Sequence, residues 1–576
     1  MSSSPILGID LGTTHSLAAV FQDGHPTLIP NALGDVMTPS AIALADDGSL
    51  LVGLAARERL GQPHTVTAFK RWMGSQHRVQ LGRHSLQPEE LSALVLKSLK
   101  ADAEAWLGQP VQRAVITVPA YFNDRQRQAT KTAGELAGLK VERLLNEPTA
   151  AGLAHGLQER AELSTFLVFD LGGGTFDVSV LEYFEGVVEV RASAGDTQLG
   201  GEDFTRLLVD AFLQGCPTLA ALPASQQAAI VQDQRLWHAA EQAKRALSDI
   251  QQKPPHTQMH WHWRDQPLSL TITQAQWQAL CQPLLARLRQ PLERALRDAR
   301  IEPDELHSIV LVGGASRMPV VHDLVRQLFG REPLLHPNPD ETVALGAALQ
   351  AALVERDAAL SEVVLTDVMP YTLGVIAADM VDGNMLDDRF SPIIERNTPV
   401  PVSRMNSYTT LQDGQTEVLL RVCQGESPRG SDNLPLGQLR VSVPARPAGQ
   451  VSIDVRFTYD ASGLLEVQAH VPATGHTVSE LILRDAQTLT DAQIKATLHK
   501  LQGLKVHPRD QQENAWLLAR AQRLYADFLG EQRQRIGQAL MQFEALLQRQ
   551  DEHEIRRHRP AFRAFLDDME NRGWRL

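Results

Sequence analysis

The chain has 576 residues, which is too long for one hydrophobic core, so several domains are expected. Its formal net charge of −13 argues against general nucleic-acid binding, because that activity requires a basic surface. The three cysteines are far apart and lack the spacing of a metal site, which favours reduced thiols in a cytoplasmic protein. The N-terminus lacks the features of a signal peptide, and no apolar run is long enough to span a bilayer, so no membrane partner is expected.

From the N-terminus to about residue 350, short apolar runs alternate with helical patterns, which is typical of an α/β domain with parallel strands. Each apolar run ends in a loop at its C-terminal end, where such sheets bind ligands. The expected strands lie within 113–122, 164–174 and 307–316, and helices are expected at 125–139 and 236–250.

Two loops in this region have related sequences. "GIDLGTTHS" (8–16) places Asp10 beside glycine and threonine, and "FDLGGGTFDVSV" (169–180) repeats that arrangement. Glycine lets a backbone approach a ligand closely and threonine suits phosphate oxygens, but a carboxylate there would repel phosphate without a divalent cation. Two copies suggest two similar halves that face one cleft. Neither a Walker nor a Rossmann motif occurs in these strand contexts.

The pattern changes after the segment 346–370. Apolar residues then alternate with polar ones, as in "QVSIDVRFTYD" (450–460), which predicts a β-sandwich-like domain. From about Leu489 the spacing is helical again. The expected division is an α/β domain at 1–360, an interdomain linker at 361–369, a β-sandwich domain at 370–487 and a helical segment at 488–576.

These motifs together resemble a known family. The two related loops, with "VLVGGASR" (310–317) at the end of a third strand, are similar to the phosphate and adenosine loops of the actin–hexokinase–heat-shock ATPase superfamily. "VITVPAYFNDRQRQATKTAGELAGL", "LLNEPTAA", "AGDTQLGGEDF" and "NPDETVALGAALQAA" narrow the resemblance to the DnaK-type heat shock protein 70 family. The compact size favours its HscC-type branch, and the resemblance extends from residue 6 to about residue 485.

The resemblance implies an α/β actin-like ATPase domain of the duplicated, ribonuclease H-like type, followed by a peptide-binding β-sandwich and an α-helical lid. It implies an ATP-dependent chaperone in which ATP hydrolysis switches the affinity for exposed apolar peptide segments of client proteins. ATP or ADP with Mg²⁺ are the expected cofactors, and K⁺ is a further candidate ion. Client polypeptides and a J-domain co-chaperone are the expected partners.

The resemblance also assigns roles to residues by their position in the motifs. The expected metal residues are Asp10, Asp170 and Asp177, and the expected catalytic residues are Lys70, Glu147, Asp170 and Thr175. The expected nucleotide-binding residues are Gly12, Thr13, Thr14, Gly172, Gly173, Gly174, Gly200, Gly201, Glu202, Glu241, Lys244, Arg245, Ser248, Gly313, Gly314, Arg317 and Asp340.

These residue types suit phosphoryl transfer, which needs positioning and charge neutralisation more than a covalent intermediate. Mg²⁺ retains several waters and uses few carboxylates, which suits three aspartates that act through water. Lys70 offers a point charge and Glu147 can orient water, so an in-line, single-displacement hydrolysis is predicted. Singly, such residues would more often be turn glycines, surface lysines or helix-face ion pairs, so the prediction depends on their ordered combination.

The β-rich part contains the residues expected to bind peptide. They are Leu373, Val375, Val418 and Leu420, which would line an apolar pocket, and Ala378 and Leu411, which would arch over the peptide. Such a pocket suits one aliphatic side chain with main-chain hydrogen bonds on either side, although each residue alone would equally suit a sandwich core. Thr366 interrupts the apolar linker run at 363–368, so weaker coupling between the domains is expected.

Several departures from the family pattern bear on partners. The loop between "ALSDI" and "LTIT" is short, so nucleotide exchange is expected to be fast or independent of an exchange factor. Arg143 matches an arginine involved with J-domain partners, and the short helical tail should hold peptide less tenaciously. "MHWHWRD" (259–265) predicts an exposed β hairpin rather than a metal site, and His15 has no assigned role.

Three alternatives remain open at this point. The same fold could serve a specialised regulator that binds one or few native clients. A sugar or metabolite kinase, or an actin-like polymerising ATPase, would also use the cleft. Neither of the last two explains the β-rich segment 370–485.

Overall fold

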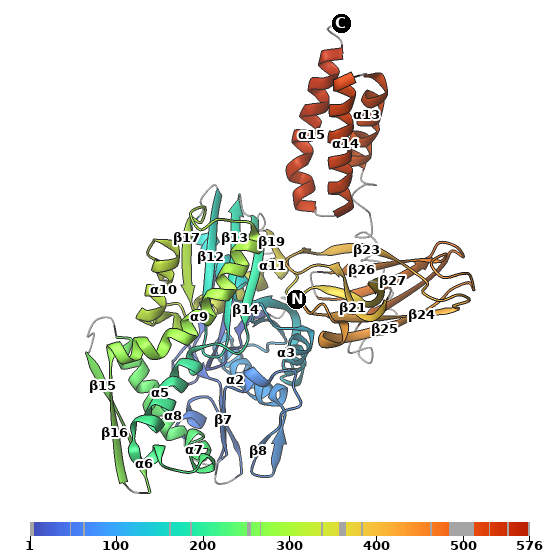
Figure 1. Ribbon diagram of the computed structural model, residues 1–576. Coiled ribbons are helices and arrows are strands. Elements are labelled where there is room, and N and C mark those ends of the chain that lie inside the picture. The colour runs from blue at the N-terminus through green and yellow to red at the C-terminus, as the bar shows by residue number, and fades with distance from the viewer. Residues whose placement is uncertain are drawn as a thin grey trace. The chain divides into compact units, whose positions relative to one another are not determined.

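The computed structural model describes residues 5–45, 48–60, 64–159, 163–184, 187–249, 255–264, 266–335, 338–355, 364–381, 384–460, 463–482, 512–528, 530–549 and 552–573. The chain forms two compact units, Met1–Pro370 and Tyr371–Leu576 (Figure 1). Within the described ranges, no helix combines the length and the apolar character needed to cross a bilayer.

The first unit contains two sheets with the same strand order. One has the order β11-β10-β1-β2-β3, with β4 also paired to β2, and the other has the order β18-β17-β12-β13-β14, with β19 added beside β14. In both, the first three strands are parallel and the last two are antiparallel to their neighbours. This repeat agrees with the two similar halves that the related loops suggest.

The strands of the first sheet are β1 (Ile6–Asp10), β2 (His15–Gln22), β3 (His25–Ile29), β4 (Thr38–Pro39), β10 (Arg113–Val118) and β11 (Lys140–Asn146). Those of the second are β12 (Leu163–Leu171), β13 (Phe176–Phe184), β14 (Val187–Asp196), β17 (Ser308–Val312), β18 (Leu334–Leu335) and β19 (Val364–Val368). Smaller sheets are formed by β5 (Ala41–Leu44), β6 (Leu50–Val52) and β7 (Thr65–Thr67), by β8 (Val79–Leu81) and β9 (His84–Leu86), and by β15 (His256–Trp263) and β16 (Gln266–Thr273).

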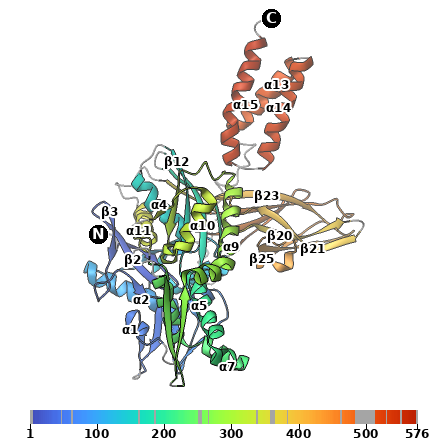
Figure 2. The ribbon, with the colours of Figure 1, turned by 60° about the vertical axis from the view of Figure 1, so that its left-hand side comes forward.

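Helices pack against these sheets and cover their apolar strands (Figure 2). The helices of the first unit are α1 (Leu54–Arg57), α2 (Pro88–Leu107), α3 (Asp124–Leu136), α4 (Glu147–Glu159), α5 (Gly201–Gly215), α6 (Pro217–Ala220), α7 (Ala224–Val231), α8 (Gln234–Leu247), α9 (Gln274–Ala299), α10 (Pro319–Phe329) and α11 (Thr342–Glu355), with the 3₁₀ turns η1 (Phe69–Trp72) and η2 (Gly314–Arg317). Of these, α6 and α7 pack on α5. The predicted helices at 125–139 and 236–250 thus correspond to α3 and α8.

Two helices join the halves of the first unit. α4 packs on the second sheet and α11 on the first, and the two helices contact each other. The approach is close at Gly346, where an added Cβ would lie 1.9 Å from the carbonyl oxygen of Ala150. The halves therefore meet through small residues on crossing helices, below the ends of the strands that carry the related loops.

The hairpin of β15 and β16 confirms the prediction for "MHWHWRD" in part. Its two strands pair antiparallel over their whole length, with Trp263 opposite Gln266. His260 and His262 are exposed, whereas Met259 and Trp261 on the opposite face are buried. The alternation therefore gives a hairpin with one solvent-exposed face and one face in the core.

The second unit contains two four-stranded antiparallel sheets, ordered β21-β20-β24-β25 and β23-β26-β27-β28. The strands are β20 (Leu373–Val381), β21 (Asn384–Ile394), β23 (Val402–Thr409), β24 (Glu417–Gln424), β25 (Leu434–Ser442), β26 (Ser452–Tyr459), β27 (Leu465–Val471) and β28 (His476–Ile482), with the short β22 (Pro399–Val400) and the 3₁₀ turn η4 (Gly430–Asp432). Val451, Ile453, Val455 and Phe457 are all buried, as their alternation predicts.

The C-terminal helices are α13 (Gln512–Asp527), α14 (Gly530–Arg549) and α15 (Glu552–Gly573), which pack on one another around a common apolar core. The predicted helical rows contribute to this core, including Leu517 and Leu524 from α13 and Ile536 and Phe543 from α14. Arg520 adds ion pairs to acidic side chains of α15. The helical pattern predicted from Leu489 onward begins outside the described residues.

Candidate functional site

Three aspartates lie at the ends of neighbouring strands in the two halves; Asp170 and Asp177 are buried and Asp10 is half-buried. Asp10 ends β1, and Asp170 lies near the end of β12, directly opposite Asp177 on β13 in the antiparallel register. Asp10 accepts a hydrogen bond from Thr117 Oγ1 at 3.0 Å, and Asp177 accepts one from the backbone N–H of Tyr121 at 3.1 Å. The strand order of the two sheets thus places the carboxylates at one cleft.

The cleft raises the pKa of all three carboxyl groups. Burial, reinforced by the charge of Glu147, raises the pKa of Asp10 to about 7 and that of Asp177 to about 8. Burial and the charges of Glu147, Asp177 and Asp10 raise the pKa of Asp170 well above its ordinary value. A nearby cation stabilises the ionised form of carboxyl groups whose pKa is raised in this way.

The donor set suits hydrated Mg²⁺. In the part of the chain that the structure describes, no three His, Cys, Asp or Glu side chains converge closely enough to bind one ion directly. Mg²⁺ keeps several of its waters and contacts few protein carboxylates, so aspartates at this spacing fit an ion held through its waters. Asp10, Asp170 and Asp177 are the residues that would hold it.

Lys70 and Glu147 form a buried ion pair beside the aspartates. Lys70 lies on η1 and Glu147 is the first residue of α4, and Nζ is 2.5 Å from Oε1. Their charges act in opposite directions on the aspartates, since Glu147 raises and Lys70 lowers the pKa of Asp10. A lysine and a carboxylate from different helices are therefore held together next to the three predicted metal residues.

The two related loops face each other in direct contact. A Cβ on Gly173 would lie 2.4 Å from Thr14 Cγ2, and a Cβ on Gly174 would lie 2.6 Å from Thr13 Cγ2. Only glycine allows this approach, because any side chain would separate the loops. The facing arrangement predicted from the repeat is confirmed.

A third glycine loop joins the second of these loops. The backbone N–H of Gly201 donates to the carbonyl of Gly172 at 2.9 Å, and that of Glu202 donates to Gly173 at the same distance. Gly200 precedes α5, whose N-terminal end carries partial positive charge that favours phosphate. Burial raises the pKa of Glu202 to about 7, which limits the negative charge at this position.

Residues of α8 line the second half of the cleft. Glu241 pairs with Lys244 at 2.6 Å and with Arg245 at 2.9 Å, and these partners outweigh burial and lower the pKa of Glu241. Lys244 Nζ also donates to the carbonyl of Gly201 at 2.9 Å, so it joins α8 to the third glycine loop. The hydroxyl of Ser248 donates to the Lys244 carbonyl at 2.8 Å.

The loop after β17 completes this wall. Gly313 has φ +80°, where glycine is favoured, and an added Cβ would meet the carbonyl of Leu171 at 2.5 Å. Gly314 approaches Asp340 just as closely, with 2.6 Å between an added Cβ and Oδ1. Asp340 accepts a hydrogen bond from Arg317 at 3.1 Å. The predicted adenosine-side residues of the η2 region are thus brought together.

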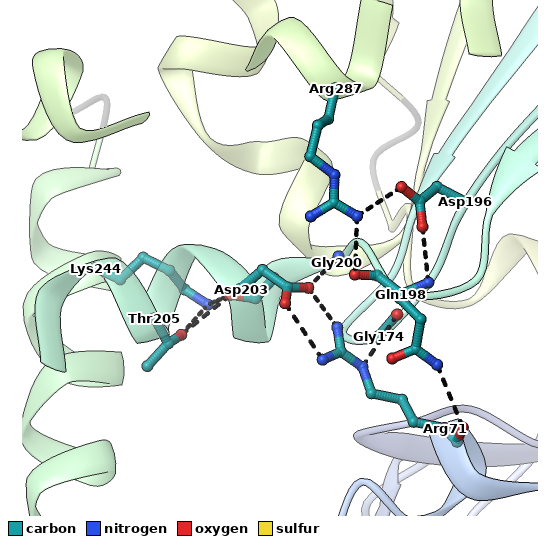
Figure 3. A network of polar contacts seen from close by, with 10 residues as sticks. Arg71, Gly174, Asp196, Gln198, Gly200, Asp203, Thr205, Lys244 and Arg287 are labelled. Carbon is teal, nitrogen blue, oxygen red and sulfur yellow. Dashed lines mark hydrogen bonds and ion pairs between the residues drawn. The ribbon is translucent and has the colours of Figure 1, made fainter. Parts of the chain in front are cut away.

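Arg71 and Asp203 form part of the cleft that the sequence prediction missed (Figure 3). Arg71 Nε donates to the carbonyl of Gly174 at 3.1 Å, and its guanidinium pairs with the Asp203 carboxylate. Asp203 also accepts from the backbone N–H of Gly200 at 2.8 Å. The signals in the sequence were the positions of Arg71 directly after Lys70 and of Asp203 directly after Glu202.

The predicted linker segment forms strand β19 of the second sheet. Thr366 pairs in register with Glu189, so it does not interrupt the strand. Asp367 accepts hydrogen bonds from Asn146, and burial raises its pKa, opposed by the charge of Arg143. Arg143 therefore lies near Asp367 of β19, and its contact with a J-domain partner remains a prediction.

The predicted peptide-binding residues differ in exposure. Leu373, Val375 and Leu420 are buried and Val418 and Ala378 are half-buried, whereas Leu411 is 48% exposed. A buried leucine such as Leu373 suits the sandwich core as well as a pocket wall.

A residue that the prediction missed adjoins Val375. Val375 lies opposite Ser391 in the register of β20 and β21, so the two side chains share one face of the sheet. Ser391 Oγ lies 2.9 Å from the hydroxyl of Tyr408, which belongs to the other sheet. Burial raises the pKa of Tyr408, so its hydroxyl stays protonated and available for hydrogen bonding.

Comparison with known proteins agrees with the site. The family model described as Hsp70 protein matches residues 6–81 and 75–559. The "Chaperone protein dnaK3" of Thermosynechococcus vestitus (strain NIES-2133 / IAM M-273 / BP-1) is 39% identical over 596 residues, a span that covers 96% of this chain and 85% of the relative. The matched residues include the β-rich unit, which a sugar kinase or a polymerising ATPase leaves unexplained.

Proposed function

Because the chain belongs to the Hsp70 family of ATP-dependent chaperones, we propose that the cleft between the two facing glycine loops is its site of ATP hydrolysis. The observation that carries the proposal is the grouping of Asp10, Asp170 and Asp177 beside the buried ion pair of Lys70 and Glu147. Asp170 and Asp177 are buried and Asp10 is half-buried. Mg²⁺ would neutralise the aspartates, and the lysine with the glycine backbone N–H groups would face the negative charge of a triphosphate.

The residues of the cleft would have separate roles in an in-line hydrolysis. Thr13, Thr14 and the glycine backbones would bind the phosphate oxygens, and Lys70 would place its charge near the terminal phosphate. Glu147 would orient a water whose oxygen bonds to the γ-phosphorus as the bond from that phosphorus to the bridging oxygen breaks. The products are ADP and inorganic phosphate, and the water's proton passes to the phosphate or to solvent. Mg²⁺, when bound, supplies further neutralisation of the phosphate charge. Thr175 and Asp170 would complete the second loop, and K⁺ is proposed as a further ion.

Substitution of Lys70 by alanine tests the site. ATP turnover should fall by at least a hundredfold, because removing one preorganised charge from a phosphoryl-transfer site costs on that order. Fluorescent ATP should still bind, since the glycine loops and α8 remain. Lys100→Ala is the matched control, because Lys100 forms a loose 3.8 Å ion pair on α2 and a 3.4 Å hydrogen bond to the carbonyl of Gly138, both away from the proposed site. Retained turnover in Lys70→Ala would refute the proposed site.

We further propose that the β-rich unit binds extended apolar peptides at Val375, Val418, Leu420 and the arch residues Ala378 and Leu411. The support is a set of apolar side chains on neighbouring strands with a partly exposed edge at Leu411. Peptide-stimulated ATP hydrolysis by the purified chain tests this assignment. Trapping clients on a Thr175→Ala variant would separate a general chaperone from a regulator of one or few native proteins.

The finer arrangement is likewise a proposal. It comprises an actin-like, ribonuclease H-like duplicated ATPase domain at 1–360, a linker at 361–369, a β-sandwich at 370–487 and a lid at 488–576. A J-domain co-chaperone acting at Arg143, little need for an exchange factor, a cytoplasmic location and membership of the HscC-type branch belong to the same proposal. The small need for an exchange factor is tested by measuring the rate of ADP release with and without the host's exchange factor. A large acceleration of release by the factor would contradict it.

A further inference from the structure

Arg71 connects the two halves of the first unit across the cleft. It lies on η1, which packs on α2 in the first half, and its guanidinium contacts the second glycine loop and α5 in the second half. Figure 3 shows the side chain pointing from η1 toward Gly174 and Asp203. We infer that Arg71 and Asp203 form a clamp that keeps the cleft closed and positions the neighbouring Lys70.

Asp203 is suited to this role because its carboxylate binds two partners. One oxygen accepts the backbone N–H of Gly200 at 2.8 Å and thereby caps the first turn of α5, while both oxygens face the guanidinium of Arg71. The glycine loop that leads into α5 and the arginine from the opposite half therefore share one anchor. Displacing Arg71 would remove a contact that holds both the glycine loop before α5 and the two halves together.

The position of the clamp ties it to nucleotide release. Arg71 bonds to the carbonyl of Gly174, and Gly174 itself touches Thr13 of the first loop. A phosphate chain held between these loops can leave only when they separate, and separation breaks the Arg71 contacts. This inference rests on the proposed ATP site, because it requires the nucleotide to lie between the loops.

The ion pair of Arg71 and Asp203 is shielded enough from solvent to stabilise the contact between the two halves. The side chains of Arg71 and Asp203 are only 16% and 25% exposed, whereas fully exposed pairs contribute little to stability. A neighbouring pair provides a contrast, because Arg287 and Asp196 lie 2.7 Å apart with exposures of 44% and 28%. Both of its members belong to the second half, on α9 and β14, so that pair does not cross the cleft.

The experiment compares full-length Arg71→Ala, Arg71→Lys, Asp203→Asn and the double variant Arg71→Ala/Asp203→Asn, with Arg287→Ala as the control. The rate of release of a fluorescent ADP analogue is measured by chase with unlabelled ADP, together with single-turnover ATP hydrolysis. Release should accelerate on the order of tenfold in Arg71→Ala and Asp203→Asn, with a smaller loss in single-turnover rate. Arg71→Lys should recover only part of the slow release, since lysine cannot contact Gly174 and Asp203 in the same geometry.

The double variant separates a clamp from two independent effects. If the residues act together, release from Arg71→Ala/Asp203→Asn should be no faster than from the faster single variant. Additive effects, or release from Arg71→Ala that matches Arg287→Ala, would overturn the inference. If Asp203→Asn lowers the melting temperature because α5 loses its cap, release from Arg71→Ala alone still decides the question, since that variant keeps the cap. Lys70→Ala distinguishes a failure of the clamp from a failure of the proposed ATP site. Retained ATP turnover in Lys70→Ala would refute the ATP site itself.

Discussion

Asn146 donates hydrogen bonds from Nδ2 to both carboxylate oxygens of Asp367, each at 2.9 Å. Asn146 ends β11 and directly precedes Glu147, the partner of Lys70 in the cleft. Asp367 of β19, in the proposed linker, therefore contacts the residue that directly precedes Glu147 of the proposed catalytic pair. A displacement of β19 would have a short, hydrogen-bonded route to the proposed site of hydrolysis.

Substitution of Asp367 by alanine should uncouple peptide binding from hydrolysis. Loss of both hydrogen bonds leaves the Asn146 amide without its acceptor and weakens β19, so peptide should no longer accelerate ATP turnover. Basal turnover should change by less than about threefold, because the cleft residues keep their own contacts. Steady-state ATPase assays with and without peptide measure this. Asp210→Ala, which removes an exposed pair with Arg206, is the control, and full stimulation of Asp367→Ala would contradict the coupling route.

His15 should make the nucleotide-free protein less stable in acid. Burial and the guanidinium of Arg57, whose Nη1 lies 2.9 Å from Nε2, lower the pKa of His15 from 6.5 to about 4. Arg245 also lowers this pKa, whereas Asp340 and Glu241 raise it.

Because the depressed pKa of His15 means that the unfolded chain binds the proton more readily, stability should fall as the pH drops from about 6.5 toward 4. The loss assigned to His15 between pH 7 and pH 5 is about 2 kcal/mol. Denaturant unfolding of the wild type and of His15→Asn at the two pH values measures it. An acid destabilisation of equal size in both proteins would exclude the histidine as its source.

Leu411 should contribute to peptide affinity but not to folding. Its side chain is 48% exposed, so truncation to alanine removes little buried surface from the free protein, whereas a bound peptide would cover it. Leu411→Ala should weaken binding of an apolar peptide roughly fivefold and leave the melting temperature nearly unchanged. Leu419→Ala is the matched control, since Leu419 is 42% exposed on β24. Equal effects of the two variants would argue against the arch assignment.

Gly346→Ala should destabilise the first unit. The new methyl group would lie 1.9 Å from the carbonyl oxygen of Ala150, and neither helix can yield without moving its backbone. Such overpacking costs about 1–3 kcal/mol or more. The melting temperature of the first unit should fall, and because α4 begins at Glu147, ATP turnover should fall with it. An unchanged melting temperature would show that the helix crossing adapts freely.

The sequence predicted the parts of this site that recur within the chain. Asp10 and Asp170 follow buried strands in two copies of one motif, so their approach to a common cleft could be inferred from parallel-sheet geometry alone. Arg71 and Asp203 carry no such signal, because they are 132 positions apart and each alone would fit a solvated surface. The partner of His15 was hidden for the same reason, since α1 and β2 meet only in the folded chain.

The proposed peptide-binding residues show what the sequence pattern could not resolve. Alternation placed Leu420 on one face of its strand, but it could not distinguish the core of a sandwich from the wall of a pocket, because both are apolar. The contact of Tyr408 with Ser391 depends on how two sheets stack, which period-two patterning does not encode.

The docking of β19 has a consequence for solubility. Val187, Val188 and Glu189 of β14 use their outward hydrogen-bonding groups to pair with Val364, Leu365 and Thr366. Without β19 those groups would form an open sheet edge, and such an edge can recruit any extended strand nearby. The strand β19 therefore also covers an edge that would otherwise be open to the kind of strand addition that leads to aggregation.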